Sequence, residues 1–352
     1  MYKQISVGED TYKLSFKPFS TAITHSGLLP SAKGNQYIIE SSRSCLYNIS
    51  NHNHDEEMNK SKKAIVTFLN LCYDFIETNY KVIFERENYF ILSNRGTYAI
   101  IVLIGSLNQF LTDNNKVNLN STPKERFSEV EKYLIVLLDY LSQIPSEEEA
   151  NLLKLYGSGA ESGWLRFFQS IINKSFPEYN PRELIDWQER QDDQLQDEGR
   201  RYSIAIEKNM KRIVLEKIQT LYQENWELEI NSIKRECMKR AEEENEKHYK
   251  EGLNRKSSTV WTEMFNITDY KTIIDKYWAK TPEGSVKEDF TTYSEDFSID
   301  IGQGFNSKPD RIRWISFFNS YRNQLAHEGT KEKGLNKEEV EFLKKIYDHF
   351  EN

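Results

Sequence analysis

The sequence predicts a mostly helical protein: an N-terminal domain with a few strands and several helices (α+β), followed by a C-terminal helical bundle. Over most of the chain, apolar residues recur every three or four positions, which is the period of a helix with one buried face. The first 55 or so residues instead alternate apolar with polar side chains or carry turn residues, as strands and loops do. A polar stretch, 189–199, places the domain boundary near residue 190.

The expected strand in the N-terminal domain rests on Tyr12, Leu14 and Phe16, which alternate with polar residues. The turn residues that follow it are Gly27, Pro30 and Gly34. Residues 50–55 are typical of an exposed loop, and they include two histidines and an aspartate. Their alternating spacing is a weak pattern for metal ligands, so we expect no metal there.

The middle of the chain is expected to be helical over 61–80, over 95–110 and from Pro123 to before Pro145. The third of these helices has the clearest start, because Thr122 is an N-cap residue and Glu125 completes a capping box. Beyond the domain boundary, residues 188–255 keep the helical period in a charge-dense composition. This pattern predicts long helices with one buried stripe and an exposed end at 239–250.

Composition and charge limit the classes of function. The 352 residues suffice for two domains, 1–190 and 191–352, and the hydrophobic content of 38% allows real cores. The formal net charge of −8 argues against broad attraction to nucleic acid, which needs clustered Lys and Arg. The cysteines have neither disulfide nor zinc-site spacing; they are Cys45, Cys72 and Cys237.

No pattern for membrane insertion or secretion is found. The longest apolar stretch, 98–104, is far too short to span a bilayer. The N-terminal residues lack the apolar run of a signal peptide. We therefore expect a cytoplasmic protein that does not contact a membrane.

One helix near the C-terminus has two distinct faces. Residues 306–309 mark its start, and Gly329 is well placed to end it. At about 100° per residue, four large side chains form one narrow stripe on the core face. These side chains are Trp314, Phe318, Tyr321 and Leu325.

The opposite face of this helix carries small neutral residues and one histidine, namely Ser316, Asn319, Ser320, Asn323 and His327. Because the chain is rich in Lys and Glu, a face without either suits close approach by another helix or by a phosphate. From Lys308 to His327 there are four cations and one anion. Lys308, Arg311 and Arg313 could therefore hold RNA, unless the two arginines merely pair with neighbouring acids.

Residues 322–327, Arg-Asn-Gln-Leu-Ala-His, resemble the hallmark of the HEPN superfamily, Arg-Asn-x-x-x-His near the end of the penultimate helix. The aromatic helix before them and a closing helix over 338–350 agree with that pattern. Trp261 and residues 269–278 also resemble a common HEPN variety, so the resemblance covers about 195–352. It implies a HEPN-like helical bundle with metal-independent ribonuclease activity, a composite site at a dimer interface and a 2′,3′-cyclic phosphate product.

The residue chemistry agrees with RNA cleavage in the absence of a metal. Such cleavage needs a base for the 2′-OH proton, an acid for the 5′-oxygen and positive charge beside the phosphorus. His327 suits proton transfer near neutral pH, Arg322 offers a planar fork for phosphate oxygens, and Asn323 can orient either. One histidine cannot readily act as both acid and base, whereas a homodimer would supply two. Its interface would contain Ser316, Asn319 and Ser320.

Two hypotheses about function stay open, and neither needs a cofactor. In the first, the chain is an endoribonuclease effector of bacterial anti-phage defence or a toxin, and residues 1–190 sense a signal or bind a partner protein. In the second, the HEPN-like bundle only assembles or binds nucleic acid in a defence or DNA-modification system. The region 90–181 resembles the C-terminal part of DGQHR proteins of such systems, although the Asp-Gly-Gln-His-Arg string is absent. The intact Arg322, Asn323 and His327 favour the first hypothesis.

Overall fold

The chain divides into two units, which we describe separately. A computed structural model places unit 1 at Met1–Ile185 and unit 2 at Asp186–Asn352, whereas the sequence pattern put the boundary near residue 190. Gly34, Cys45, His327 and Gly329, for which the sequence led to expectations, are not among the residues that the structure describes. The structure describes residues 2–7, 10–30, 32–33, 36–37, 46–84, 93–155, 159–251, 258–284, 290–302, 304–326 and 334–351.

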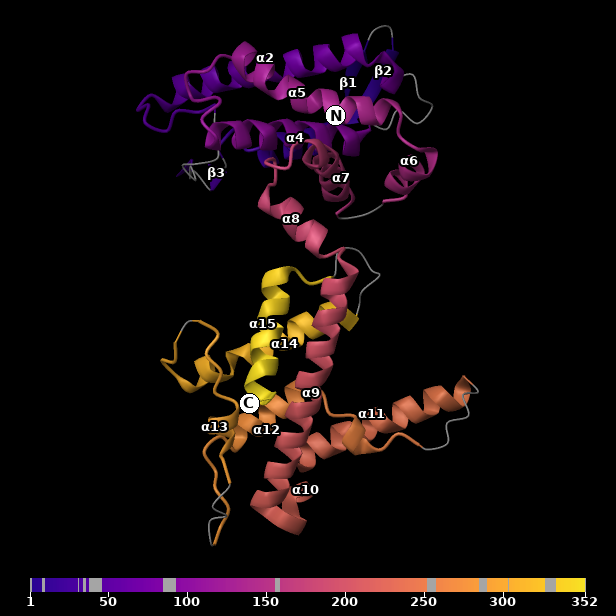
Figure 1. Ribbon diagram of the computed structural model, residues 1–352, viewed down its shortest axis with the longest axis vertical. Coiled ribbons are helices and arrows are strands. Elements are labelled where there is room, and N and C mark those ends of the chain that lie inside the picture. Colours follow the sequence, from indigo (N-terminus) through magenta and orange to yellow (C-terminus); the bar gives the residue numbers. More distant parts are fainter. Residues whose placement is uncertain are drawn as a thin grey trace. The chain divides into compact units, whose positions relative to one another are not determined.

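Unit 1 contains two hairpins and a set of packed helices (Figure 1). The strands are β1 (Tyr2–Val7), β2 (Asp10–Ser15), β3 (Ala32–Lys33) and β4 (Gln36–Tyr37). The helices are α1 (Phe16–His25), α2 (His54–Asn79), α3 (Lys81–Phe84), α4 (Asn94–Asp113), α5 (Pro123–Ser142), α6 (Ser146–Leu153) and α7 (Ala160–Ser175). The boundary between the units falls within α8 (Arg182–Glu189).

The expected α+β class is wrong, and the protein belongs to the all-α class. The described core of unit 1 is formed by residues of helices and their connections. The strands form two separate two-stranded antiparallel hairpins rather than a sheet layer. The alternating pattern ends with β2 at Ser15, and Phe16 already begins α1. Because a single hairpin is too small to form a layer of the core, a short alternating pattern does not establish an α+β class.

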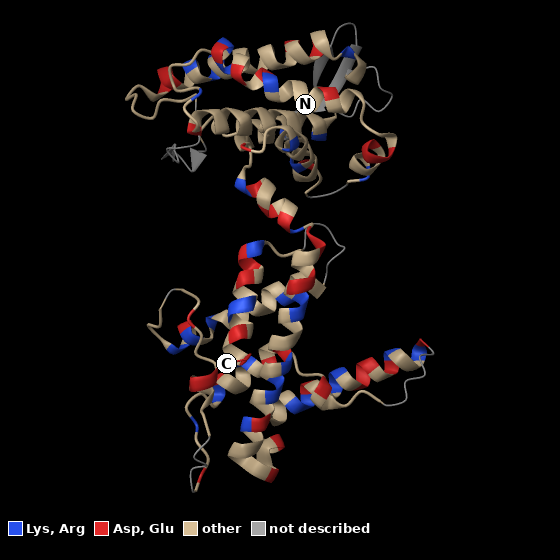
Figure 2. Cartoon of the chain, in the orientation of Figure 1, with Lys and Arg blue, Asp and Glu red and all other residues tan. Residues whose placement is uncertain are grey.

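Helix α4 is the central helix of unit 1. Its residues are buried on nearly all sides, and in Figure 2 it is almost free of charged residues. It packs against α1, α5 and α7. At Gly105, an added Cβ would collide with the backbone carbonyl of Ser26. The glycine therefore allows the end of α1 to lie directly against α4.

The expected start of α5 is confirmed. The backbone N–H of Glu125 donates to Thr122 Oγ1 at 3.3 Å, and the Thr122 N–H donates to Glu125 Oε2 at 2.7 Å. These two hydrogen bonds complete the capping box. The helix ends at Ser142, before Pro145, as the sequence pattern indicates.

Unit 2 is built around α9, the longest of its described helices (Figure 1). Helix α9 spans Asp193–Tyr222. The other elements of unit 2 are η2 (Gln223–Asn225), α10 (Trp226–Glu229), α11 (Asn231–Lys250), η3 (Trp261–Glu263), α12 (Ile267–Lys276), α13 (Tyr293–Asp296), α14 (Lys308–Ala326) and α15 (Lys337–Glu351). Helices α12, α14 and α15 pack against α9. The expected helical bundle is therefore confirmed.

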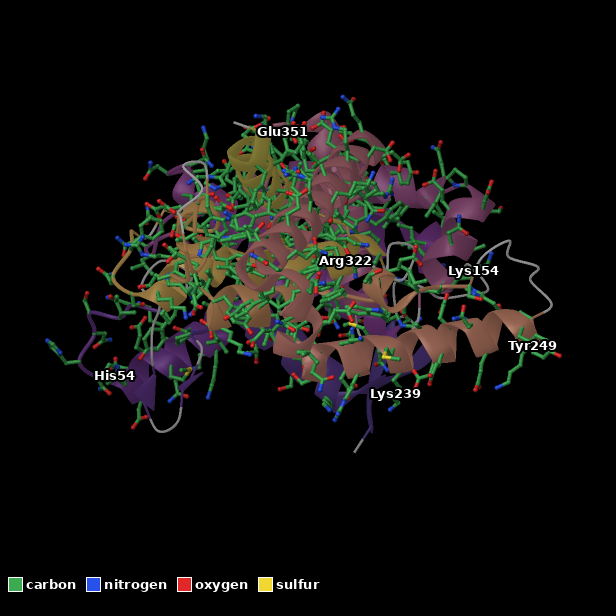
Figure 3. The ribbon with its side chains drawn as sticks, turned by 90° about the horizontal axis from the view of Figure 1, so that it is seen from below. His54, Lys154, Lys239, Tyr249, Arg322 and Glu351 are labelled. Atoms are coloured by element: carbon green, nitrogen blue, oxygen red, sulfur yellow. The ribbon has the colours of Figure 1, made fainter. Side chains whose placement is uncertain are left out.

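Helix α11 extends away from this bundle (Figure 1). Figure 2 shows basic and acidic residues interleaved along it. Tyr249 lies at its outer end (Figure 3) and is 88% exposed. This arrangement confirms the exposed helix end expected for 239–250. Among the described helices of the whole chain, none is long and apolar enough to cross a membrane.

Candidate active site

The candidate site lies on α14, whose start is fixed by local hydrogen bonds. Asp310 accepts a hydrogen bond from Ser307 Oγ at 2.8 Å and another from the Asn306 N–H at 3.2 Å. The first of these bonds is the main cause that lowers the pKa of Asp310. The carboxylate therefore stays charged beside the positive end of the helix dipole, where it is favourable.

The core stripe expected on α14 is confirmed in its main residues. Trp314, Phe318 and Leu325 are buried, and Tyr321 is half-buried. The Trp314 indole N–H donates to the Phe297 carbonyl at 3.0 Å, so its polar atom is satisfied in the core. This buried stripe determines which residues of α14 face outwards.

The opposite face of α14 is largely exposed, and it contacts a lysine from another helix that the sequence pattern did not reveal. Ser316, Ser320 and Asn323 are exposed, whereas Asn319 is half-buried. Lys271, on α12, donates from Nζ to Ser316 Oγ at 3.0 Å. The face lacks Lys and Glu of its own, but the fold brings a lysine onto it from a neighbouring helix.

Arg322 (labelled in Figure 3) forms an ion pair with Glu207 on α9. Arg322 Nε lies 3.2 Å from Glu207 Oε2, and Nη2 lies 3.4 Å from Oε1. The guanidinium thus presents two N–H groups to one carboxylate, as it would to two oxygens of a phosphate. The two side chains are 42% and 31% exposed, so the pair remains accessible to solvent.

Tyr270 of α12 lies near enough to Glu207 to feel its charge. Its side chain is buried. Burial raises the pKa of the Tyr270 phenol, and the negative charge of Glu207 raises it further. The phenol therefore stays neutral at physiological pH and cannot compete as an anion for Arg322.

Glu207, Lys271 and Tyr270 were not assigned to the site from the sequence, although 269–278 contributed to the resemblance. They lie on α9 and α12, far from α14 along the chain, and each has a side chain that is common on an amphipathic helix. Only the packing of α9 and α12 against α14 brings them to the site. No local spacing could have indicated them.

Two members of the expected catalytic set are described, and one is not. Asn323 is exposed on the last turns of α14, next to Arg322. His327 follows Ala326, where the described helix ends, and lies outside the described residues. The structure thus places the guanidinium and the amide at the C-terminal end of α14.

The expected RNA-binding residues all interact with other groups of unit 2. Lys308 pairs with Asp275, with Nζ 2.6 Å from Oδ1. The guanidinium of Arg311 lies 4.8 Å from the centre of the Phe305 ring, and that of Arg313 lies 5.7 Å from the centre of the Phe317 ring. Lys308 therefore has a carboxylate partner of its own, and RNA would have to displace it.

A metal site is not evident in the described part of the chain. No group of three or more His, Cys, Asp or Glu residues gathers there in a way that could hold an ion. His54 begins α2 and hydrogen-bonds the Tyr47 hydroxyl at 3.0 Å. The expected loop at 50–55 thus ends at Asn53, which caps this helix.

Comparison with protein families, with characterised proteins and with solved structures finds no match for this chain. The resemblance to HEPN proteins therefore depends on residues 322–327 and their context alone.

Proposed function

We propose that unit 2 is a metal-independent endoribonuclease of the HEPN type. The main support for this proposal is the ion pair of Arg322 with Glu207, in which an accessible guanidinium presents two N–H groups beside Asn323. A phosphate that replaced the Glu207 carboxylate would accept the same two hydrogen bonds. Arg322 would then stabilise the negative charge that develops on the phosphorane.

In this proposal His327 moves the protons. One histidine takes the proton from the 2′-OH, whose oxygen attacks the phosphorus, and a second one protonates the departing 5′-oxygen. The product carries a 2′,3′-cyclic phosphate. Since each chain supplies one His327, two copies of the chain form one site. Asn323 orients the phosphate or the imidazole.

Positive charge near Arg322 supports RNA as the substrate. Lys211 lies one turn from Glu207 on the same face of α9, and it forms no ion pair with any described residue. Together with Lys271, Lys211 provides local positive charge in a chain whose net charge is negative. Local charge of this kind attracts the phosphates of RNA.

We further propose that the enzyme acts as an effector of anti-phage defence or as a toxin, with unit 1 as its sensing or partner-binding module.

The test is RNA cleavage by wild-type protein, Arg322→Ala and His327→Ala, each with and without EDTA. We expect wild-type protein to cleave total RNA with and without the chelator, and both variants to be inactive. Arg235→Ala and His52→Ala serve as matched controls, since both side chains are exposed and both residues lie outside the motif in the sequence. Loss of wild-type activity in EDTA, restored by a divalent metal, would refute the mechanism. RNA binding without cleavage would instead support the non-catalytic hypothesis.

A further inference from the structure

Unit 1 contains a cleft that the proposed ribonuclease site does not use. Its volume is about 710 Å³, within the range of sites for small molecules. It lies between α4 and α7, and the end of α1, residues 178–181 and Glu183 also line it. All of its lining residues belong to unit 1.

One wall of the cleft depends on the close approach of α1 to α4 at Gly105. This approach brings His25 to Tyr98, so that His25 Nδ1 and the Tyr98 hydroxyl form a hydrogen bond of 2.7 Å. Tyr98 is buried, whereas His25 is exposed. The wall therefore ends in a polar pair that solvent and a ligand can reach.

The floor of the cleft is a network of buried polar side chains. The Gln169 amide Nε2 donates to Ser106 Oγ and to the Tyr179 hydroxyl, both at 3.2 Å. Ser106 and Tyr179 are themselves 2.9 Å apart. Gln169 is 1% exposed and Tyr179 is fully buried. Because buried polar groups are costly unless every one is satisfied, this network fixes the position of each member.

Arg166 is held by this network and faces the cleft. Its Nη1 donates to Gln169 Oε1 at 2.5 Å. Burial and the negative charge of Glu161 raise the pKa of Tyr98, and burial raises that of Tyr179 to about 12, while the positive charge of Arg166 opposes the rise in both. The guanidinium thus lies near both phenols. It forms no ion pair with any carboxylate in the described part of the chain.

We propose that this cleft binds a small organic anion, whose carboxylate or phosphate is held by Arg166. A half-buried guanidinium without a carboxylate partner gains most from an anion that enters the cleft. Ser106 and the His25–Tyr98 pair can hydrogen-bond the rest of the ligand. The exposed acids at the rim repel a polyanion such as RNA; they are Asp113, Glu178 and Glu183. A small ligand with one anionic group therefore fits best.

The test uses the full-length protein and four probes at millimolar concentration: inorganic phosphate, acetate, citrate and AMP. Melting curves and calorimetric titrations compare wild-type protein with Arg166→Gln. Lys174→Gln is the matched control, because it removes one positive charge from an exposed position of the same helix. We expect at least one probe to bind wild-type protein and Lys174→Gln equally. Arg166→Gln should weaken that binding roughly tenfold or more, since a charge-assisted hydrogen bond is lost.

The proposal is wrong if none of the four probes binds wild-type protein, or if Arg166→Gln binds them as well. Binding of phosphate or of acetate tells whether the cleft prefers a phosphate or a carboxylate group. Binding of either one supports the proposal that Arg166 holds an anion. If Arg166→Gln fails to fold, Arg166→Met decides, because it removes the charge and keeps an unbranched side chain that can pack at a half-buried position. Affinity in Arg166→Met equal to that of wild-type protein would then overturn the proposal.

Discussion

At the scale of single residues, Glu207 is the most informative neighbour of the candidate site. Its carboxylate occupies the two N–H groups of Arg322 that a phosphate would use. The pair is partly exposed, so it contributes little to stability, about 0.2–1 kcal/mol. Glu207 is therefore a competitor of RNA phosphate for the guanidinium.

Replacement of Glu207 by Gln should tighten RNA binding. Because the ion pair no longer has to be broken, we expect KM for RNA to fall by up to about fivefold, with kcat nearly unchanged. Glu216→Gln is the control, since it also removes an exposed carboxylate that pairs with an arginine on α9. Steady-state kinetics on a labelled RNA would measure both constants. A large fall in kcat would instead mean that Glu207 positions Arg322 for catalysis.

Arg322→Ala should separate activity from stability. Since Arg322 is 42% exposed and its ion pair is a surface pair, we expect the free energy of unfolding to change by no more than about 1 kcal/mol, while cleavage is lost. Urea denaturation followed by circular dichroism would measure the change. A much larger loss of stability would assign Arg322 a structural role.

At the scale of the helix, the core stripe of α14 predicts the opposite behaviour. Trp314→Ala removes a fully buried indole that stacks on Phe297 and donates to its carbonyl. We expect a loss of roughly 3–5 kcal/mol, from the cavity and from the unsatisfied carbonyl. Ser320→Ala, on the exposed face of the same helix, should change stability by less than about 0.5 kcal/mol. Equal losses in the two variants would contradict the assignment of faces.

The elements that sequence predicts well are those with local causes. The start of α5 follows from three residues within one turn, and the buried stripe of α14 follows from helical periodicity. The prediction of an α+β class was wrong because the brief alternation that begins at Tyr12 belongs to one strand of a single hairpin and ends at Ser15. The partners of α14 could not be predicted, since Glu207 and Lys271 reach it only through tertiary packing.

At the scale of the whole molecule, the exposed face of α14 is the candidate surface for a second copy of the chain. Ser316 already accepts a hydrogen bond from Lys271, so a glutamate at 316 would be partly neutralised within its own chain. Ser320 is exposed and lies one turn further along α14. A charge at Ser320 therefore tests the interface more cleanly.

Ser320→Glu should make the protein monomeric and inactive together, with its fold retained. In a two-fold dimer each subunit presents the same patch, so the new carboxylate would meet its own copy and repel it. Ser232→Glu, at an exposed position of α11, is the matched control and should leave assembly and cleavage unchanged. Light scattering coupled to gel filtration would measure the mass, and the RNA assay would measure activity on the same fractions. A wild-type protein that cleaves RNA as a strict monomer would rule out the composite site, because one His327 would then have to serve as both acid and base.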